Sequence, residues 1–176
     1  MLLLIKILLT LPVAYALMYP FLNSTEATGV FKEIEMLGPI GSVVLASVLL
    51  ALVFFYCRDL HRTLSLIRPT ARVATPKSVW LMFLIPYNFI EDFFIVANVA
   101  NSLKQEAKHN NALGSLKQFG MASGIGWCSA QIVSLLPNEI GSAAGLLALI
   151  LWIIHWRFIR KVNGMLAETT VSQRCH

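Results

Sequence analysis

Five apolar runs, joined by short polar links, limit what this chain can fold into. They cover residues 1–21, 39–57, 79–103, 119–136 and 140–158. A helix of about 20 residues crosses the hydrocarbon core of a bilayer, so the first, second, fourth and fifth runs are long enough to span it. Backbone polar groups in lipid must be hydrogen-bonded within their own segment, which favours helices. The sequence therefore predicts an all-α, polytopic membrane protein with four transmembrane helices.

The composition excludes a soluble globular protein. Of the 176 residues, 57% are hydrophobic and 13% are charged, whereas roughly 25% of residues are charged in a soluble domain. We expect a single membrane domain over residues 1–176, because this length leaves no room for a separate soluble domain. The scattered cysteines show no metal-ligand spacing, so no cofactor or metal is expected. The basic residues lie beside apolar runs, which indicates the lipid bilayer and not nucleic acid as their partner.

The third run contains residues that hydrocarbon disfavours, in the stretch LIPYNFIEDFF. A helix entering this run must end near Pro86, because the residue before a proline avoids the α-helical region. The following NFIE has the form of a capping box, with Asn88 as the N-cap and Glu91 three residues later. We therefore predict a helix–break–helix segment over about residues 76–106, with Thr75 as the N-cap of its first helix.

The links between the runs differ in charge. Residues 58–78, residues 104–118 and the tail after Trp156 are basic, whereas residues 22–38 and the PNEI link are acidic. Basic segments tend to stay on the cytoplasmic side. A third run that crossed the membrane would put two basic segments outside, whereas one that enters and returns leaves all of them inside. We predict a re-entrant segment and two cytoplasmic termini, with a full third crossing as the alternative.

The first run has two interpretations. It contains AYA, which resembles the cleavage site of a signal peptide. We interpret it instead as the first span, with the Lys6 side chain extending back to the membrane surface from which the span starts.

Polar side chains within the third run form a candidate intramembrane site: Asn88, Glu91, Asp92 and Asn98. Ionisable residues at membrane depth often mark function, and broken helices can present their ends to an ion or a substrate. The plainer interpretation is that these residues cap a helix and contact water or headgroups. A cluster that lines a cavity would favour transport, whereas a cluster among headgroups would favour a structural role.

Basic residues after the second run are candidate contacts for anionic lipid: Arg58, Arg62, Arg68, Arg72 and Lys77. Orientation of the chain in the membrane would also explain them. His61 in this link and His155 near the end of the fifth run are expected at the membrane interface. Haem ligation by the two is conceivable but not expected, because neither lies deep in a span.

Glycines four positions apart occur in the last two runs: Gly120 and Gly124 in the fourth, and Gly141 and Gly145 in the fifth. Such spacings let helix backbones approach closely. Because the PNEIG link is short, we predict that the two runs pack through these glycines as an antiparallel hairpin. Contacts within an oligomer are the alternative.

A W-x-x-F-L-x-P-x-N motif, formed by Trp80, Phe83, Pro86 and Asn88, follows a basic loop that contains proline, and WRFIRK ends the last run. With this order of elements, residues 40–163 resemble a family of small bacterial inner-membrane proteins catalogued only as a domain of unknown function. That family usually has a further proline soon after the asparagine, where this chain has two acidic residues. The resemblance implies a bacterial four-helix membrane domain and no active site.

The sequence contains no HExxH, no GxSxG and no phosphate-binding glycine loop, so an enzyme is not expected. We expect a non-catalytic integral membrane subunit that packs against or regulates a larger membrane complex. Its partners would be the bilayer and a second membrane protein or further copies of this chain. The alternative is a small transporter or channel for an ion, proton or small solute, built around the broken helix at residues 86–92.

Overall fold

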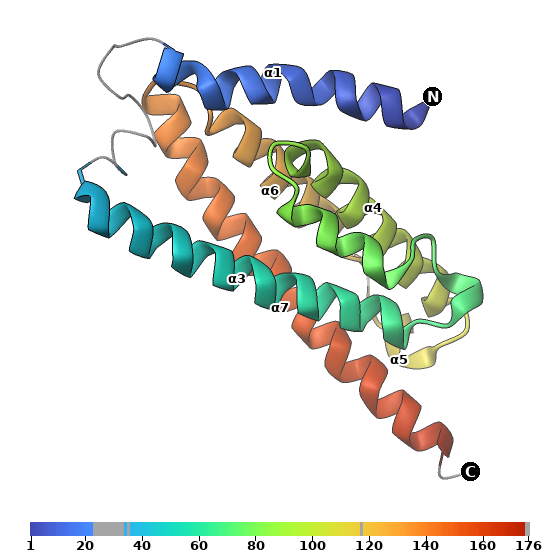
Figure 1. Ribbon diagram of the computed structural model, residues 1–176. Helices are drawn as coiled ribbons and strands as arrows, with labels where there is room; N and C mark the ends of the chain where they lie inside the picture. The colour runs from blue at the N-terminus through green and yellow to red at the C-terminus, as the bar shows by residue number, and fades with distance from the viewer. Residues whose placement is uncertain (23–33, 35, 117, 175–176) are drawn as a thin grey trace.

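The computed structural model describes residues 1–22, 34, 36–116 and 118–174, and every regular element among them is helical (Figure 1). The long helices are α1 (Leu2–Leu22), α3 (Gly38–Leu66), α4 (Asn88–Ala107), α6 (Met121–Val133) and α7 (Glu139–Arg174). The short ones are η1 (Pro69–Ala71) and η2 (Pro76–Phe83), both of the 3-10 type, and α5 (Asn111–Gly114). The predicted all-α class is confirmed, whereas most of the acidic link at residues 22–38 lies outside the described residues.

Within the described part of the chain, three helices are long and apolar enough to cross a membrane: Leu2–Tyr19 within α1, Gly38–Leu66 of α3 and Glu139–Thr169 within α7. These helices are consistent with the predicted membrane protein. The predicted fourth span is shorter than expected. Its apolar run covers residues 119–136, but the helix α6 has 13 residues, about 20 Å at 1.5 Å per residue. It begins after Gly120, whose φ of 77° places that residue in the left-handed region, outside the helix.

The core lies where α3, α4 and α7 come together. Buried side chains there include Leu60 and Leu64 of α3, Val96 and Leu103 of α4, and Ile159 of α7. Hydrogen bonds join α3 to α7 at this end: the indole N–H of Trp156 donates to the Asp59 carboxylate (2.7 Å) and the Thr63 hydroxyl donates to Asn163 Oδ1 (2.8 Å). Figure 1 shows α3 and α7 crossing here and separating toward their N-terminal ends.

The third apolar run is broken, as Pro86 predicts. The 3-10 helix η2 ends at Phe83, residues 84–87 turn, with a cis peptide bond between Ile85 and Pro86, and α4 begins at Asn88. Figure 1 shows η2 and α4 as the two arms of a hairpin whose turn lies toward the middle of the molecule. A single unbroken helix over residues 79–103 is therefore excluded.

The predicted caps of this segment are confirmed only in part. Thr75 is the N-cap residue of η2, as predicted, but its side chain makes no capping hydrogen bond. The N-cap of α4 is Tyr87, so the predicted cap at Asn88 is wrong. The cause is the turn itself, whose carbonyls already accept the first N–H groups of α4. Asn88 N donates to Leu84 O (2.9 Å) and Phe89 N donates to Pro86 O (3.3 Å). The Asn88 side chain is therefore not needed to cap α4.

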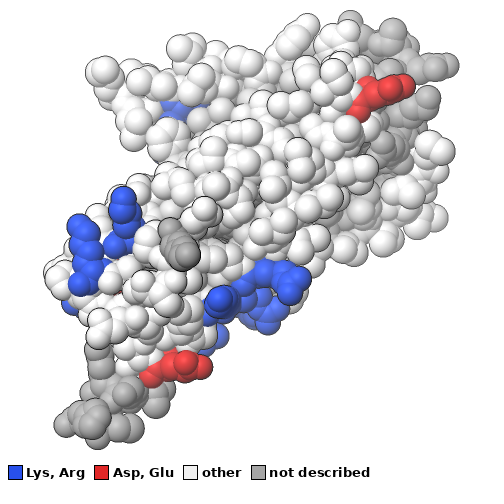
Figure 2. Space-filling model, turned by 180° about the vertical axis from the view of Figure 1, so that it is seen from behind, with Lys and Arg blue, Asp and Glu red and all other residues white. Residues whose placement is uncertain are grey.

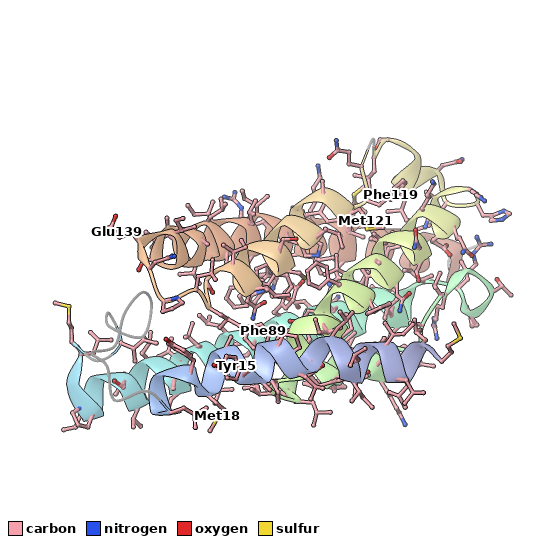
Figure 3. The ribbon with its side chains drawn as sticks, turned by 90° about the horizontal axis from the view of Figure 1, so that it is seen from above. Tyr15, Met18, Phe89, Phe119, Met121 and Glu139 are labelled. Carbon is pink, nitrogen blue, oxygen red and sulfur yellow. The ribbon has the colours of Figure 1, made fainter. Side chains whose placement is uncertain are left out.

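The α6–α7 hairpin is closely packed, and it runs along one side of the molecule while α1 runs along the other (Figure 3). A Cβ added to Gly124 would overlap Val96 of α4 and approach the His155 ring of α7 to 3.1 Å, so this glycine serves close packing, with α4 and not α7 as its tightest neighbour. Gly120 lies against Phe158 and the same histidine. A Cβ on Gly141 would instead meet the backbone of the 134–138 link that joins the two helices. Gly145 lines a cavity.

Candidate functional site

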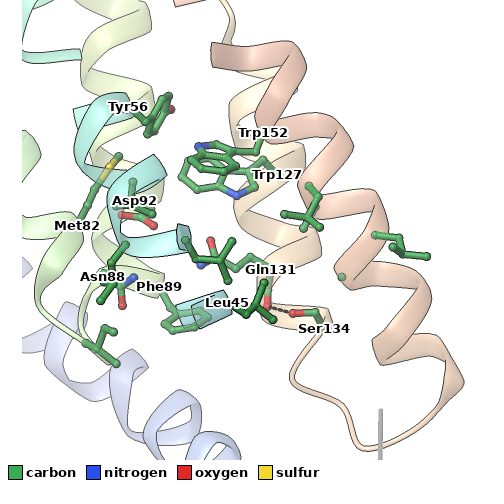
Figure 4. A pocket seen from close by; sticks show the side chains of 18 of the residues that line it. Leu45, Tyr56, Met82, Asn88, Phe89, Asp92, Trp127, Gln131, Ser134 and Trp152 are labelled. Atoms are coloured by element: carbon green, nitrogen blue, oxygen red, sulfur yellow. Dashed lines mark hydrogen bonds between the residues drawn. The ribbon is translucent and has the colours of Figure 1, made fainter. Parts of the chain in front are cut away.

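A cavity of about 670 Å³ lies between α3, the η2–α4 turn, α6 and α7 (Figure 4). It occupies the space that opens where α3 and α7 separate from each other. Most of its wall is apolar, and leucine is the commonest residue in it. The cavity is therefore a consequence of the crossing of two long helices that are joined at one end only.

The mouth of the cavity lies between the N-terminal halves of α3 and α7. Leu49 and Leu50 line it from α3, and Leu146 and Leu149 line it from α7. These side chains are also exposed on the outer surface, Leu50 to 51% and Leu146 to 63%. Since both helices are candidate membrane spans, this mouth faces the region that lipid would occupy.

The inner end of the cavity is polar. Asn88 and Asp92, one turn apart on α4, share a face of that helix and point into the cavity (Figure 4). Tyr56 of α3, Gln131 of α6 and Trp152 of α7 line the same space. The site therefore combines polar side chains from four helices.

Each of these five side chains has a buried polar atom with no hydrogen-bond partner: Tyr56 OH, Asn88 Oδ1, Asp92 Oδ1, Gln131 Oε1 and Trp152 Nε1. Burying a polar group without a partner is unfavourable, and it is unusual in folded proteins. Five such atoms around one cavity indicate a place where water or the polar groups of a ligand would be bound.

Asp92 is the most unusual member of this cluster. It is 2% exposed, and α4 is not among the helices that are apolar enough to span the membrane. Burial raises the pKa of the Asp92 carboxyl well above its usual range, and the neighbouring Glu91 carboxylate raises it further. Asp92 is therefore a site that can hold a proton or release it.

Glu91 is oriented differently and does not complete a capping box. Its carboxylate accepts a hydrogen bond from Lys6 Nζ of α1 at 2.6 Å, and the two side chains are 7% and 11% exposed. The Lys6 ammonium also lies 4.0 Å from the centre of the Phe94 ring. The prediction that Lys6 extends to the membrane surface is therefore wrong, because a buried carboxylate on α4 binds it.

Asn98 belongs to a different part of α4. It is half-buried, and it is not among the residues that line the cavity. The four polar residues predicted as one intramembrane site thus separate into the pair Asn88 and Asp92 in the cavity, Glu91 in an ion pair, and Asn98 outside both.

Two of the candidate lipid contacts are used within the protein. Arg68 Nε lies 3.1 Å from both carboxylate oxygens of Glu106, and Arg72 donates to the carbonyls of Ile67 and Ser65. The other three, Arg58, Arg62 and Lys77, are exposed. Figure 2 shows that the basic side chains on one face gather toward the end that carries the C-terminal part of α7.

The two histidines are not equivalent. His155 is 1% exposed, with its Nδ1 3.1 Å from the Ser123 hydroxyl, so it packs inside the protein, and its position at the membrane interface stays a prediction. His61 is half-buried beside the Trp80 ring. Among the described residues, no group of three or more His, Cys, Asp or Glu side chains is placed to hold a metal ion.

The fold and this site define an all-helical membrane protein with an apolar cavity and a polar inner end. Comparisons of the chain with protein-family models, with curated proteins and with solved structures find no match. The resemblance to a family of bacterial inner-membrane proteins therefore stays a prediction.

Proposed function

We propose that this protein is a small, non-catalytic membrane transporter that takes a small, largely apolar molecule from the bilayer into the cavity between α3 and α7. The observation that carries the proposal is the set of five unpartnered polar atoms on the side chains that line this cavity. Its volume of about 670 Å³ is within the usual range for small-molecule sites, roughly 300–1,000 Å³. An α-helix of a partner protein, about 10–12 Å across with its side chains, would need more space.

The position of the polar cluster favours transport over a purely structural role. Asn88 and Asp92 are buried against a cavity, away from the outer surface where headgroups would contact them. Neither side chain caps a helix, since the turn carbonyls satisfy the start of α4. A structural role as a helix cap therefore does not explain the buried, unpartnered oxygens of these two residues.

A subunit of a larger membrane complex, or of a homo-oligomer, is the second candidate function. Only 11% of the most apolar window of α1, and the same share in α3, is buried within the chain. A partner helix could cover these faces, as lipid could.

The directions of the helices support a topology with four passes and a re-entrant segment, in which α6, with 13 residues, is the short pass. In Figure 1, α1 runs opposite to α3 and α7, and η2 and α4 enter and leave on the side where α3 ends. The basic side chains gather at that end, which we assign to the cytoplasm together with both termini. We place the protein in the bacterial inner membrane, in keeping with the family that it resembles.

A photoreactive dodecanol, carrying a diazirine in its chain, tests the proposed function in lipid nanodiscs. The protein should be labelled on residues of the cavity wall, as located by peptide mass spectrometry. Leu149→Trp, which fills the mouth, should reduce this labelling at least fivefold. Leu147→Trp is the matched control, because Leu147 is on the same helix and 50% exposed but is not part of the cavity lining.

Equal labelling of the two variants, or labelling spread evenly over the lipid-facing surface, would contradict binding in the cavity. In that case the subunit function would be favoured, and a partner captured by cross-linking in native membranes should lie on α1 or α3.

A further inference from the structure

The charges around Asp92 are unbalanced. The titratable groups that interact with it are Glu91 on its own helix, Tyr56 and Cys57 of α3, and Cys128 of α6, all of which are acids or neutral. From α7, the buried His155 lies against Tyr56 and Ser123. The η2 residues Val79 and Met82 that pack nearby carry no charge.

The nearest cation on α1 is already bound. Lys6 forms its ion pair with Glu91 and also contacts the Phe94 ring. Lys6 is not among the residues that line the cavity. Among the described residues of the cavity wall there is no lysine, arginine or histidine, so nothing in the wall neutralises an ionised Asp92.

Aromatic rings stand around the same inner end. The ring of Tyr56 lies 5.6 Å from that of Trp127 and 5.7 Å from that of Trp152, edge to face, and Phe89 lines the cavity beside Asn88 (Figure 4). The faces of tryptophan, tyrosine and phenylalanine rings attract organic cations, most strongly where water is excluded. The wall thus combines an unpartnered carboxyl group with aromatic rings.

The rest of the wall, up to the mouth at Leu50 and Leu146, is mainly apolar, with Ser134 and Ser142 as its polar members. A ligand that matches both the carboxyl group at the inner end and the apolar wall has one cationic head and an apolar chain or body. Resting on the proposed function, we infer that the transported molecule is a lipophilic organic cation, with its ammonium head at Asp92 and its apolar part along α3 and α7.

Binding would then exchange one cation for one proton. A carboxyl group in these surroundings is stable when it is protonated or when it is paired with a cation. When the ammonium head arrives, the O–H bond of Asp92 breaks, the proton leaves to water, and the carboxylate pairs with the cation. The net charge of the site is unchanged, and no redox or covalent partner is needed.

Two diazirine probes with the same dodecyl chain test this inference in lipid nanodiscs, one with a trimethylammonium head and one with a hydroxyl head. The trimethylammonium charge is permanent, so only groups of the protein titrate. The wild-type chain should bind the cation at least tenfold more tightly than the alcohol at pH 8.5. Because binding releases one proton, the affinity for the cation should rise with pH, by up to tenfold per pH unit.

Two variants locate the effect. Asp92→Asn keeps the size and polarity of the side chain, and it should abolish both the preference for the cation and the pH dependence while the alcohol still labels the cavity. Glu91→Gln, next in the sequence but facing Lys6, should retain both. If Glu91→Gln fails to fold, the pH series on the wild-type chain still decides the question.

The outcomes separate the inference from the proposed function. One outcome is that both probes label the wild-type chain equally at every pH and lose this labelling in Leu149→Trp. That result would contradict the inference of a cationic ligand but would support a cavity that binds neutral amphiphiles. Labelling by either probe that Leu149→Trp leaves unchanged would overturn both.

Discussion

Glu91 and Asp92 are adjacent in sequence but their side chains lie in different surroundings. The Glu91 carboxylate contacts Lys6 of α1 at 2.6 Å, whereas Asp92 lines the cavity between α3 and α7 with an unpartnered oxygen. Consecutive positions on a helix differ by about 100° in direction. Glu91 can therefore form an ion pair with α1 while Asp92 lines the cavity. The two acids should therefore respond differently to substitution.

Loss of one partner of the Lys6–Glu91 pair should destabilise the protein. Lys6→Met leaves a buried carboxylate without its cation, and breaking a buried pair costs about 3–5 kcal/mol. The double variant Lys6→Leu with Glu91→Leu should recover most of this loss, because it leaves no unpaired charge. Unfolding by denaturant in detergent measures both. A loss of stability in the double variant equal to the summed losses of Lys6→Leu alone and Glu91→Leu alone would show that the residues are not coupled.

A methyl group at Gly124 should be harmful, whereas a methyl group at Gly164 should not. At Gly124 it would overlap Val96, and at Gly164 nothing lies within 4 Å. Gly124→Ala should lower the free energy of unfolding by about 1–3 kcal/mol, as overpacking usually does. Gly164→Ala, in the C-terminal half of α7, should be neutral or stabilising, since alanine favours a helix by about 1 kcal/mol over glycine. Thermal denaturation of the two variants compares them directly.

The proposed topology can be tested by labelling in intact cells. In a Cys175→Ser background, which removes the tail cysteine, Gly114→Cys should resist a membrane-impermeant maleimide and Glu139→Cys should react with it. Gly114 follows the re-entrant segment, and Glu139 begins α7 at the opposite end of the hairpin. Cys57 and Cys128 are buried and should remain unlabelled. Reaction at Gly114→Cys from outside would show that the third run crosses the membrane.

The stability of the ligand-free protein should fall as the pH rises. The pKa of Asp92 is raised in the folded state, whereas an unfolded chain has an aspartate pKa near 3.9. Between these two values the folded state binds the extra proton, so each pH unit removes up to about 1.4 kcal/mol of stability. Above the folded-state pKa no further loss is expected. Asp92→Asn should flatten this part of the curve, measured by thermal denaturation from pH 4 to pH 9.

Local features of the sequence predicted the local structure well. Pro86 predicted the break in the third run, and the glycine at 124 predicted a close approach of helices. The cap at Asn88 was wrong because the turn from Leu84 to Tyr87 supplies carbonyls that a sequence pattern does not show. The predicted length of the fourth span was wrong, because an apolar run does not show that Gly120 adopts a left-handed conformation and lies outside the helix.

The candidate site was predictable only in part. Asn88 and Asp92 stand out as polar residues in an apolar run. Tyr56, Gln131 and Trp152 join them from helices far away in the sequence, and each is unremarkable in its own apolar run. The partner of Lys6 was equally hidden, since Glu91 follows it by 85 positions. Such pairings depend on how helices cross, which no single run specifies.

The contacts of α3 with α7 near Asp59 make the crossing of these helices a pivot. Trp156 and Asn163 are hydrogen-bonded to Asp59 there, and α7 continues beyond them to Arg174. If a guest molecule widened the mouth at Leu50 and Leu146, the two helices would rotate about this pivot. The part of α7 beyond Asn163 would then swing in the opposite sense. Binding of a ligand in the cavity would thus move the C-terminal part of α7 at the other end of the molecule, although the ligand and this segment do not touch.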